Sequence, residues 1–159
     1  MNKTYLLLGS NIGNSKARLS KATLQIKKHI GNVTRQSSVY ATAAWGNTKQ
    51  PDFLNQVIIV ETKLPALQTM QAILSIEKKM GRIRTLKNAP RIIDIDILFF
   101  NKEIINSKDL SVPHPQIQNR RFVLIPLNQL SPNLRHPVLK KSVHQLLIHC
   151  PDKLNVKKF

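Results

Sequence analysis

One apolar segment of the chain carries two acids in alternation with isoleucines: Pro90-Arg91-Ile92-Ile93-Asp94-Ile95-Asp96-Ile97-Leu98-Phe99-Phe100. Its β-branched and aromatic residues, with their alternation, predict a β-strand over 90–100. Because successive side chains of a strand point to opposite faces, Asp94 and Asp96 should share one face. Ile93, Ile95 and Ile97 should then share the other. The backbones of the two acids should lie about 7 Å apart, so their carboxylates can converge.

The chemistry of this pair depends on whether a cation joins it. Two like charges side by side in an apolar strand raise each other's pKa, and a divalent cation would remove the repulsion. Carboxylate pairs that hold Mg²⁺ together with substrate phosphates are common in phosphoryl-transfer sites. An isolated Asp-x-Asp is more often a solvated strand face, so the choice between the two interpretations depends on the rest of the chain.

Composition indicates one soluble globular domain with an excess of positive charge. The 159 residues suit one core, and 25 Lys+Arg against 8 Asp+Glu give a net charge of +17. That charge attracts nucleotides, nucleic acids or acidic surfaces. Cys150 is the only cysteine, which excludes a disulfide framework and favours a cytoplasmic location. We expect no signal peptide and no membrane span, because no apolar run is long enough.

Hydrophobic periodicity and turn residues predict the element order β-α-β-β-α-β, followed by a hairpin and C-terminal helices. The expected strands cover 4–8, 34–40, 53–61 and 90–100, with short ones near 103–105 and 110–112. The expected helices run from 15 to a cap at Gly31, from Pro65 to Gly81, over 119–130 and over 142–149. The apolar side of the second helix should comprise Leu67, Met70, Ile73, Leu74 and Met80. This order predicts a ferredoxin-like split β-α-β sandwich, an α+β fold with antiparallel strands and helices on one face.

Two features near the paired acids have the chemistry of phosphate binding. The stretch Arg82-Ile83-Arg84-Thr85-Leu86-Lys87-Asn88-Ala89-Pro90-Arg91 places four cations in a predicted loop directly before the acid strand. Such a loop alone is usually solvated surface, but beside a carboxylate pair it can form the anion-binding half of a metal-phosphate site. His114 lies between Pro113 and Pro115, which fix its backbone. It is as well explained by a structural role as by a catalytic one.

Taken in order, these motifs resemble the 6-hydroxymethyl-7,8-dihydropterin pyrophosphokinase family. The matching segments are Leu8-Gly9-Ser10-Asn11, 42–46, Gln50-Pro51-Asp52-Phe53-Leu54-Asn55, Glu77, Gly81-Arg82-Ile83-Arg84, 90–97, Val112-Pro113-His114-Pro115 and 120–127. They cover nearly the whole chain, and Pro-Arg-x-x-Asp-x-Asp combined with Pro-His-Pro is quite specific. The resemblance implies one pyrophosphokinase domain over 1–159, usually a monomer.

The resemblance also implies a reaction and its residues. The hydroxymethyl oxygen of the pterin would attack the β-phosphorus of ATP and AMP would leave, with two Mg²⁺ ions held by Asp94 and Asp96. The implied catalytic residues are Arg82, Arg91, Asp94 and Asp96. The implied ATP-binding residues are Glu77, Arg82, Arg84, Arg91, Ile97, His114 and Arg120. The implied pterin-binding residues are Thr42, Trp45, Phe53, Asn55 and Phe122, with the two phenylalanines on either side of the ring.

The chain departs from the family pattern in its loops. The departures are Ala43 and Ala44 where many members have prolines, Leu74 where some have Gln, Asn88 where some have an aromatic residue, and Pro115 where some have Tyr. A further conflict concerns Arg91, which strict alternation would point away from Asp94 and Asp96. The resemblance therefore requires a bend or twist at the start of the strand.

Two other functions fit part of the sequence. An RNA-binding ferredoxin-like module would suit the charge of +17, but aromatic residues make up only 5% of the chain. No RNP-type segment is present, and the acid pair would have no role. A metal-dependent nucleotidyl transferase with another acceptor would use the acid pair but not the segments around Trp45 and Phe53. We therefore predict a pyrophosphokinase acting on ATP and 6-hydroxymethyl-7,8-dihydropterin, with no specific nucleic-acid partner.

Overall fold

The computed structural model describes residues 1–43, 51–83 and 90–159. The strands are β1 (Asn2–Ser10), β2 (Gly31–Gln36), β3 (Tyr40–Thr42), β4 (Phe53–Thr62), β5 (Asp94–Phe100), β6 (Ile105–Asn106), β7 (Ser111–Val112) and β8 (Lys157–Lys158). The helices are α1 (Ser15–His29), α2 (Ala66–Lys79), α3 (Arg121–Leu130) and α4 (Val143–Ile148), with a 3₁₀ turn at Ile117–Asn119. Among the described residues, no helix is long and apolar enough to cross a membrane.

The main sheet has the strand order β5-β1-β4-β3-β8, with β2 also paired to β4. All of its pairings are antiparallel. The strands β1 and β2 lie on either side of β4, and β4 and β5 lie on either side of β1, as a split β-α-β arrangement requires. The predicted α+β fold of the ferredoxin-like type is therefore confirmed, and the predicted added hairpin is β6 paired with β7.

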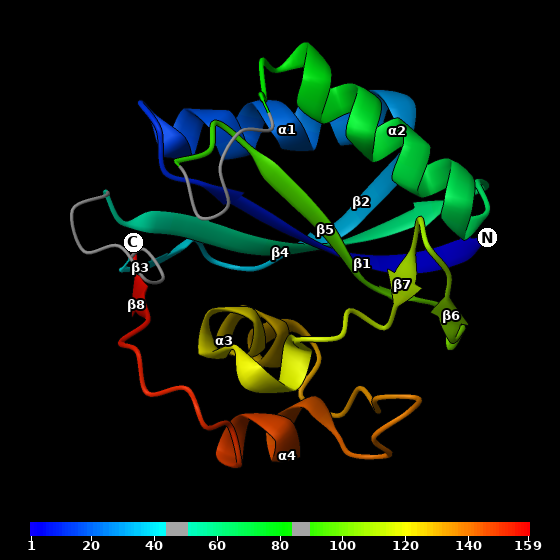
Figure 1. Cartoon of the computed structure of the whole chain (residues 1–159), viewed down its shortest axis with the longest axis vertical. Helices are drawn as coiled ribbons and strands as arrows, with labels where there is room; N and C mark the ends of the chain where they lie inside the picture. The colour runs from blue at the N-terminus through cyan, green and yellow to red at the C-terminus, as the bar shows by residue number, and fades with distance from the viewer. Residues whose placement is uncertain (44–50, 84–89) are drawn as a thin grey trace.

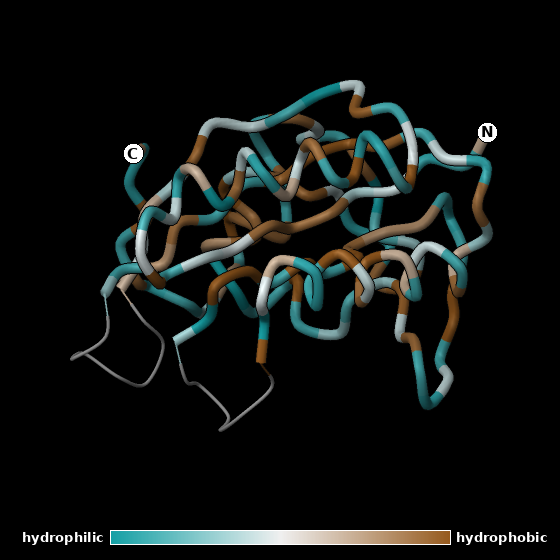
Figure 2. The backbone as a smooth tube through the Cα atoms, turned by 90° about the horizontal axis from the view of Figure 1, so that it is seen from above, coloured by the Kyte–Doolittle hydropathy of each residue, from teal (hydrophilic) through white to brown (hydrophobic). Residues whose placement is uncertain are grey.

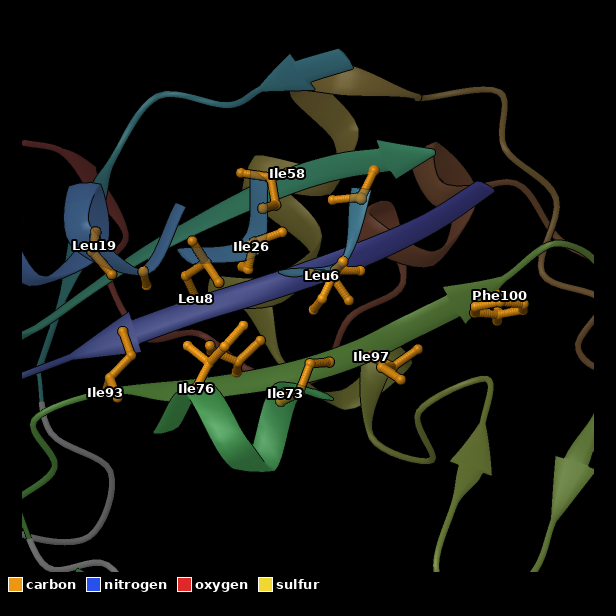
Figure 3. Packing of buried hydrophobic residues seen from close by; sticks show 14 of the residues in the cluster. Leu6, Leu8, Leu19, Ile26, Ile58, Ile73, Ile76, Ile93, Ile97 and Phe100 are labelled. Carbon is orange, nitrogen blue, oxygen red and sulfur yellow. The ribbon is translucent and has the colours of Figure 1, made fainter. Parts of the chain in front are cut away.

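Helices cover both faces of the sheet (Figure 1), and each face has its own hydrophobic core. On one face, Leu6 and Leu8 of β1 pack with Ile26 of α1 and Ile73 of α2 (Figure 3). On the other, Tyr5, Leu7 and Phe99 pack with residues of α3 and α4. Figure 2 shows the most hydrophobic runs in the central strands, whereas the helices alternate between apolar and polar residues. The prediction of helices on one face was thus right only for α1 and α2, because β1 is apolar on both faces.

Two predicted boundaries near β2 were wrong. The strand expected over 34–40 is two strands, interrupted where Ser37 exchanges hydrogen bonds with Val57: its amide donates to the carbonyl at 2.8 Å, and its hydroxyl accepts from the amide at 2.9 Å. Gly31 does not cap α1, which ends at His29 with Ile30 as its C-cap, but begins β2. A Cβ at Gly31 would lie 2.1 Å from the carbonyl oxygen of Glu61, so the close approach of β2 to β4 requires glycine there.

The predicted apolar side of helix α2 is confirmed in part: Ile73 and Met80 are buried, and Met70 packs against the same core. Leu67 and Leu74 are 48% and 43% exposed, so their assignment to the apolar side was wrong. The buried residues are Ala66, Thr69, Ile73, Ile76 and Glu77. Leu67 and Leu74 each follow a buried residue, and one residue turns a helix by about 100°. The two leucines therefore project to the edge of the buried face and beyond it.

Candidate active site

A cavity of about 420 Å³ lies on the face of the sheet that α3 covers. Its lining comprises Leu7, Gly9, Thr42, Ala43, Phe53, Asn55, Arg91, Asp94, Asp96, Gln116, Asn119, Arg120, Phe122 and Leu154. Strands β1, β4 and β5 form its floor, and the start of α3 and the end of β3 contribute its walls. Residues far apart in the sequence thus meet in one space because three neighbouring strands present the same face.

The two acids lie where strand alternation places them. Asp94 pairs in register with Gly9 of β1, and Asp96 with Leu7. Both carboxyl-bearing residues line the cavity, whereas Ile95 is buried in the core on the opposite face. The prediction that the two acids share one face is confirmed.

Asp94 accepts hydrogen bonds from two arginines. Nη1 of Arg82 lies 2.7 Å from its Oδ1, and Nη1 of Arg91 lies 3.0 Å from its Oδ2. Strand β5 begins at Asp94 rather than at residue 90, and residue 92 lies in a bend. The amide of Arg91 donates to Oδ1 of Asn11 at 2.8 Å. Because Asn11 directly follows β1, this hydrogen bond ties the bend to the end of that strand. The expected bend is confirmed, and it brings Arg91 to the same side as the acid pair.

Glu77 forms a buried ion pair with Arg82. It is buried, with 3% exposure, and its Oε2 lies 2.6 Å from Nη1 of Arg82 and accepts from the amide of Ile95 at 2.8 Å. Burial raises the pKa of Glu77, against the opposing effects of the Ile95 amide and the Arg82 charge. Arg82 therefore bridges a buried acid and a cavity acid, an arrangement that fixes its guanidinium in one direction.

Four described residues assigned to ATP by the resemblance are not among those that line the cavity: Glu77, Arg82, Ile97 and His114. Arg82 reaches it through its ion pair with Asp94. Glu77 lies behind Arg82, and Ile97 is 2% exposed within the core beneath α1 and α2 (Figure 3). Arg84 and Trp45 lie outside the described residues, as do Ala44 and Asn88. The ATP contacts of these residues, and the pterin contact of Trp45, remain predictions.

Of the two cavity acids, Asp96 is the one that forms no ion pair or hydrogen bond through its side chain with the described residues. Burial, followed by the negative charges of Asp94 and Glu77, raises the pKa of Asp96 to about 7, against the opposing charges of Arg120 and Arg82. A carboxylate in this state gains most from a cation that replaces its proton.

His114 and Arg120 lie at the other end of the acid pair. The amide of His114 donates to the carbonyl of Leu98 at 2.9 Å, and its Nδ1 accepts from the amide of Gln116 at 3.1 Å. Burial, and then the charge of Arg120, lower the pKa of His114 to about 4, with Asp94 opposing them. The imidazole is therefore neutral at physiological pH with its proton on Nε2, and it is a hydrogen-bond donor without being a cation.

The predicted pterin residues that the structure describes all line the cavity. Phe53 and Asn55 come from β4, Thr42 from the end of β3 and Phe122 from the start of α3. The guanidinium of Arg120 lies 5.9 Å from the ring centre of Phe122. Asn55 is buried, with 4% exposure, and no described group hydrogen-bonds its side-chain amide, which leaves both its donor and its acceptor for a ligand.

Sequence reasoning missed several lining residues. Gln116 and Asn119 follow the Pro-His-Pro block, and their place beside a motif was a usable signal. Gly9 belongs to the matching segment Leu8-Gly9-Ser10-Asn11, but no binding role was predicted for it. Leu154 had no signal at all, because it lies far along the chain from every motif and reaches the cavity only through the path of the C-terminal segment.

Comparisons with known proteins agree with this geometry. The family model described as 7,8-dihydro-6-hydroxymethylpterin-pyrophosphokinase (HPPK) matches residues 5–132. The 2-amino-4-hydroxy-6-hydroxymethyldihydropteridine pyrophosphokinase of Aquifex aeolicus is 37% identical over 145 residues, covering 91% of this chain and 90% of the relative. The Bacillus subtilis protein of the same name is 38% identical over 130 residues, covering 81% and 78%.

Solved structures show the same fold. Wild-type HPPK-DHPS of Plasmodium falciparum, solved with pteroate, matches with a TM-score of 0.77 at 19% identity, over 92% of this chain and 42% of that one. The present chain thus spans less than half of that solved chain, and the likeness at this identity concerns the fold alone. The family model and the curated relatives carry the assignment, and the chain belongs to the 7,8-dihydro-6-hydroxymethylpterin-pyrophosphokinase family.

Proposed function

We propose that the protein transfers the pyrophosphoryl group of ATP to 6-hydroxymethyl-7,8-dihydropterin, in folate biosynthesis, and releases AMP. The observation that carries this proposal is that one cavity joins two kinds of chemistry. Phe53, Asn55 and Phe122 suit a flat heterocycle, while Asp94, Asp96 and the arginines beside them suit a metal-bound polyphosphate. The reaction requires both substrates to meet in line, and a cavity lined by both kinds of side chain can bring them together.

The acceptor end suits a pterin ring. Fused heterocycles bind between aromatic faces with a few placed hydrogen bonds. Phe53 and Phe122 come from different elements, a strand and a helix, so the slot between them is held by the packing of α3 on the sheet. The side chain of Asn55 offers one acceptor and two donors, which can pair with the polar edge of the ring.

The acid pair fits Mg²⁺ carried by a nucleotide. Mg²⁺ is usually bound through one or two carboxylates together with substrate phosphates rather than by a protein cage. The described residues offer no cluster of three or more His, Cys, Asp or Glu side chains that would hold a metal alone. As the family resemblance implies, Asp94 and Asp96 would bind two Mg²⁺ ions together with ATP. Bound there, the ions would neutralise phosphate charge and align the groups for transfer.

The chain's own residues position the phosphates. Arg91 lines the cavity, and Arg82, held by Glu77, meets it at Asp94. Both neutralise negative charge where the β-phosphoryl group is transferred. Arg120 does the same from the side of α3, and Nε2–H of His114 donates to a phosphate oxygen. The pterin hydroxyl oxygen bonds to the β-phosphorus, the bond from that phosphorus to the oxygen bridging it to the α-phosphorus breaks, and the hydroxyl proton is released to solvent.

The products of ATP test this proposal. Protein incubated with ATP, Mg²⁺ and 6-hydroxymethyl-7,8-dihydropterin should form AMP in equal amount to the pterin diphosphate, as separated by chromatography. Formation of ADP, or no turnover by folded protein, would rule the proposal out. Asp94→Ala and Asp96→Ala should each lower kcat by about 10²- to 10⁴-fold with the fold retained. Asp109→Ala, which removes an exposed acid, is the matched control and should keep wild-type turnover.

A further inference from the structure

The C-terminal segment contributes a wall of the cavity. After α4 the chain runs past α3 and reaches the edge of the sheet at β3, the red segment in Figure 1. On the way, Leu154 lines the cavity that also contains Thr42 and Phe122. Residues 133–159 lie beyond the part of the chain that the family model matches, so the role of this segment has to be derived from its contacts.

One anchor of the segment is Asp152, which is 8% exposed. Its Oδ2 accepts from the amide of Arg121 at 3.0 Å, and its Oδ1 accepts from the amide of Leu154 at 2.9 Å. Arg121 is the first residue of α3, whose N-cap residue, Arg120, provides no side-chain cap. A carboxylate at this end satisfies a free amide and interacts favourably with the helix dipole. One side chain thus fixes both the helix start that carries Phe122 and the backbone that carries Leu154.

The second anchor is β8. Lys158 pairs with Tyr40 and Lys157 with Ala41 of β3, and the amide of Phe159 donates to the carbonyl of Val39 at 2.9 Å. On its other edge β3 pairs with β4, where Thr42 lies opposite Phe53. The segment therefore connects the wall that carries Phe122 to the wall that carries Thr42 and Phe53.

We infer that residues 151–159 position the acceptor end of the cavity, with Leu154 as a contact to the bound ring and Asp152 as a positioning residue. The inference rests on the proposed function, because that function makes this the pterin end. An apolar side chain held between the two walls limits the width of the slot and excludes water from the ring face. Asp152 and β8 keep the Leu154 side chain in this place, because Asp152 ties the segment to the start of α3 and β8 ties it to β3.

Substitution of Leu154 in the full chain tests the contact. Leu154→Ala should raise the KM for the pterin about 5- to 10-fold, while kcat and the KM for ATP stay within twofold. Leu154→Met, which restores the volume, should return the pterin KM to within twofold of wild type. Asn155→Ala changes the exposed neighbour and should behave as wild type. A pterin KM that is unchanged in Leu154→Ala would overturn the inference.

Asp152 needs a comparison that separates positioning from stability. Asp152→Ala should raise the pterin KM at least as much as Leu154→Ala, and Asp152→Asn, which keeps one acceptor oxygen, should raise it less. Ser142→Ala is the matched control, because it removes the capping box of α4 and lowers the melting temperature without touching the cavity. If Asp152→Ala lowers the melting temperature like Ser142→Ala and leaves the pterin KM unchanged, Asp152 is a helix cap only.

Direct binding distinguishes this inference from the proposed reaction. The fluorescence of the pterin reports its binding to the protein without any turnover. If wild type binds the pterin but forms no AMP, the proposed reaction is overturned, while weaker binding to Leu154→Ala still supports the inference. If wild type forms AMP and Leu154→Ala binds the pterin equally well, the reaction stands and the inference is overturned.

Discussion

Gly9 of β1 and Asn55 of β4 are cross-strand neighbours, and a Cβ at position 9 would lie 2.8 Å from Oδ1 of Asn55. The amide of Asn55 therefore occupies space that exists only because residue 9 has no side chain. Both residues line the cavity. The glycine is explained by the side chain that it accommodates rather than by an unusual backbone conformation.

Gly9→Ala should therefore impair acceptor binding more than folding. The added methyl group would force the short Asn55 side chain to rotate, and its amide would no longer meet the ring edge. We expect the pterin KM to rise about tenfold, which corresponds to about 1.4 kcal/mol, with a loss of unfolding free energy of about 1 kcal/mol. Steady-state kinetics and urea denaturation measure the two quantities.

A double-mutant cycle provides the control for this prediction. In an Asn55→Ala background the methyl group meets no amide, so Gly9→Ala should change the pterin KM by no more than twofold. Equal effects of Gly9→Ala in both backgrounds would show that the glycine acts on the cavity independently of Asn55.

Removal of Glu77 should destabilise the protein and impair transfer. Glu77→Ala breaks a buried ion pair with Arg82 and leaves the amide of Ile95 without its acceptor, so we expect a loss of about 3 kcal/mol in unfolding free energy. Because Arg82 is then held only by Asp94, kcat should fall at least tenfold. Glu77→Gln keeps one acceptor oxygen, so its unfolding free energy and its kcat should lie between those of wild type and Glu77→Ala. Glu103→Ala, at an exposed acid, should stay within about 0.5 kcal/mol of wild type, and equal stability of the two alanine variants would contradict the prediction.

The pKa of Asp96 predicts that, in the absence of metal, its contribution to stability is lost as the pH rises from 3.8 to about 7. Burial raises this pKa from 3.8 to about 7. Between these values the folded state keeps a proton that the unfolded state has lost, so the contribution of Asp96 to stability falls as the pH rises. Relative to Asp96→Asn, wild type should lose on the order of 2 kcal/mol between pH 4 and pH 8. Urea denaturation of both proteins in the presence of EDTA measures this loss. If the difference in unfolding free energy between wild type and Asp96→Asn does not vary with pH, the raised pKa of Asp96 is refuted.

His114 predicts the opposite dependence at acidic pH. Its pKa is lowered from 6.5 to about 4, so the unfolded state binds a proton that the folded state does not over that range. The contribution of His114 to stability should therefore fall as the pH drops from 6.5 to 4, by on the order of 2 kcal/mol. Urea denaturation of wild type and of His114→Asn over this range measures it as the difference between the two proteins, in which the contribution of Asp96 cancels. His114→Asn keeps an acceptor for the amide of Gln116 and should remove this dependence. Burial also lowers the pKa of His136, but that residue is present in both proteins, so its contribution cancels in the comparison.

Local periodicity predicted the parts of the fold that depend on local rules. Alternation in a strand places Asp94 and Asp96 on one face whatever the rest of the chain does, and the structure confirms it. Local rules failed where another element decides. Gly31 is a glycine because Glu61 of β4 lies against it, and the exposure of Leu67 and Leu74 follows from which side of α2 packs on the sheet. The residues around these positions in the sequence identify neither Glu61 as the contact of Gly31 nor the side of α2 that meets the sheet.

The sequence by itself determined the order of the elements apart from the division of β2 from β3 and the C-terminal strand β8. It also determined the common face of the acid pair and, through its motifs, the family. Only the tertiary structure decided which residues surround the cavity: the bend that turns Arg91 toward Asp94, the gap at Gly9 that admits Asn55, and the C-terminal segment that brings Leu154 beside Phe122. The physical reason is distance along the chain. Strand and helix periods act over a few residues, whereas the cavity is formed by side chains that approach one another only after both cores have packed on the sheet.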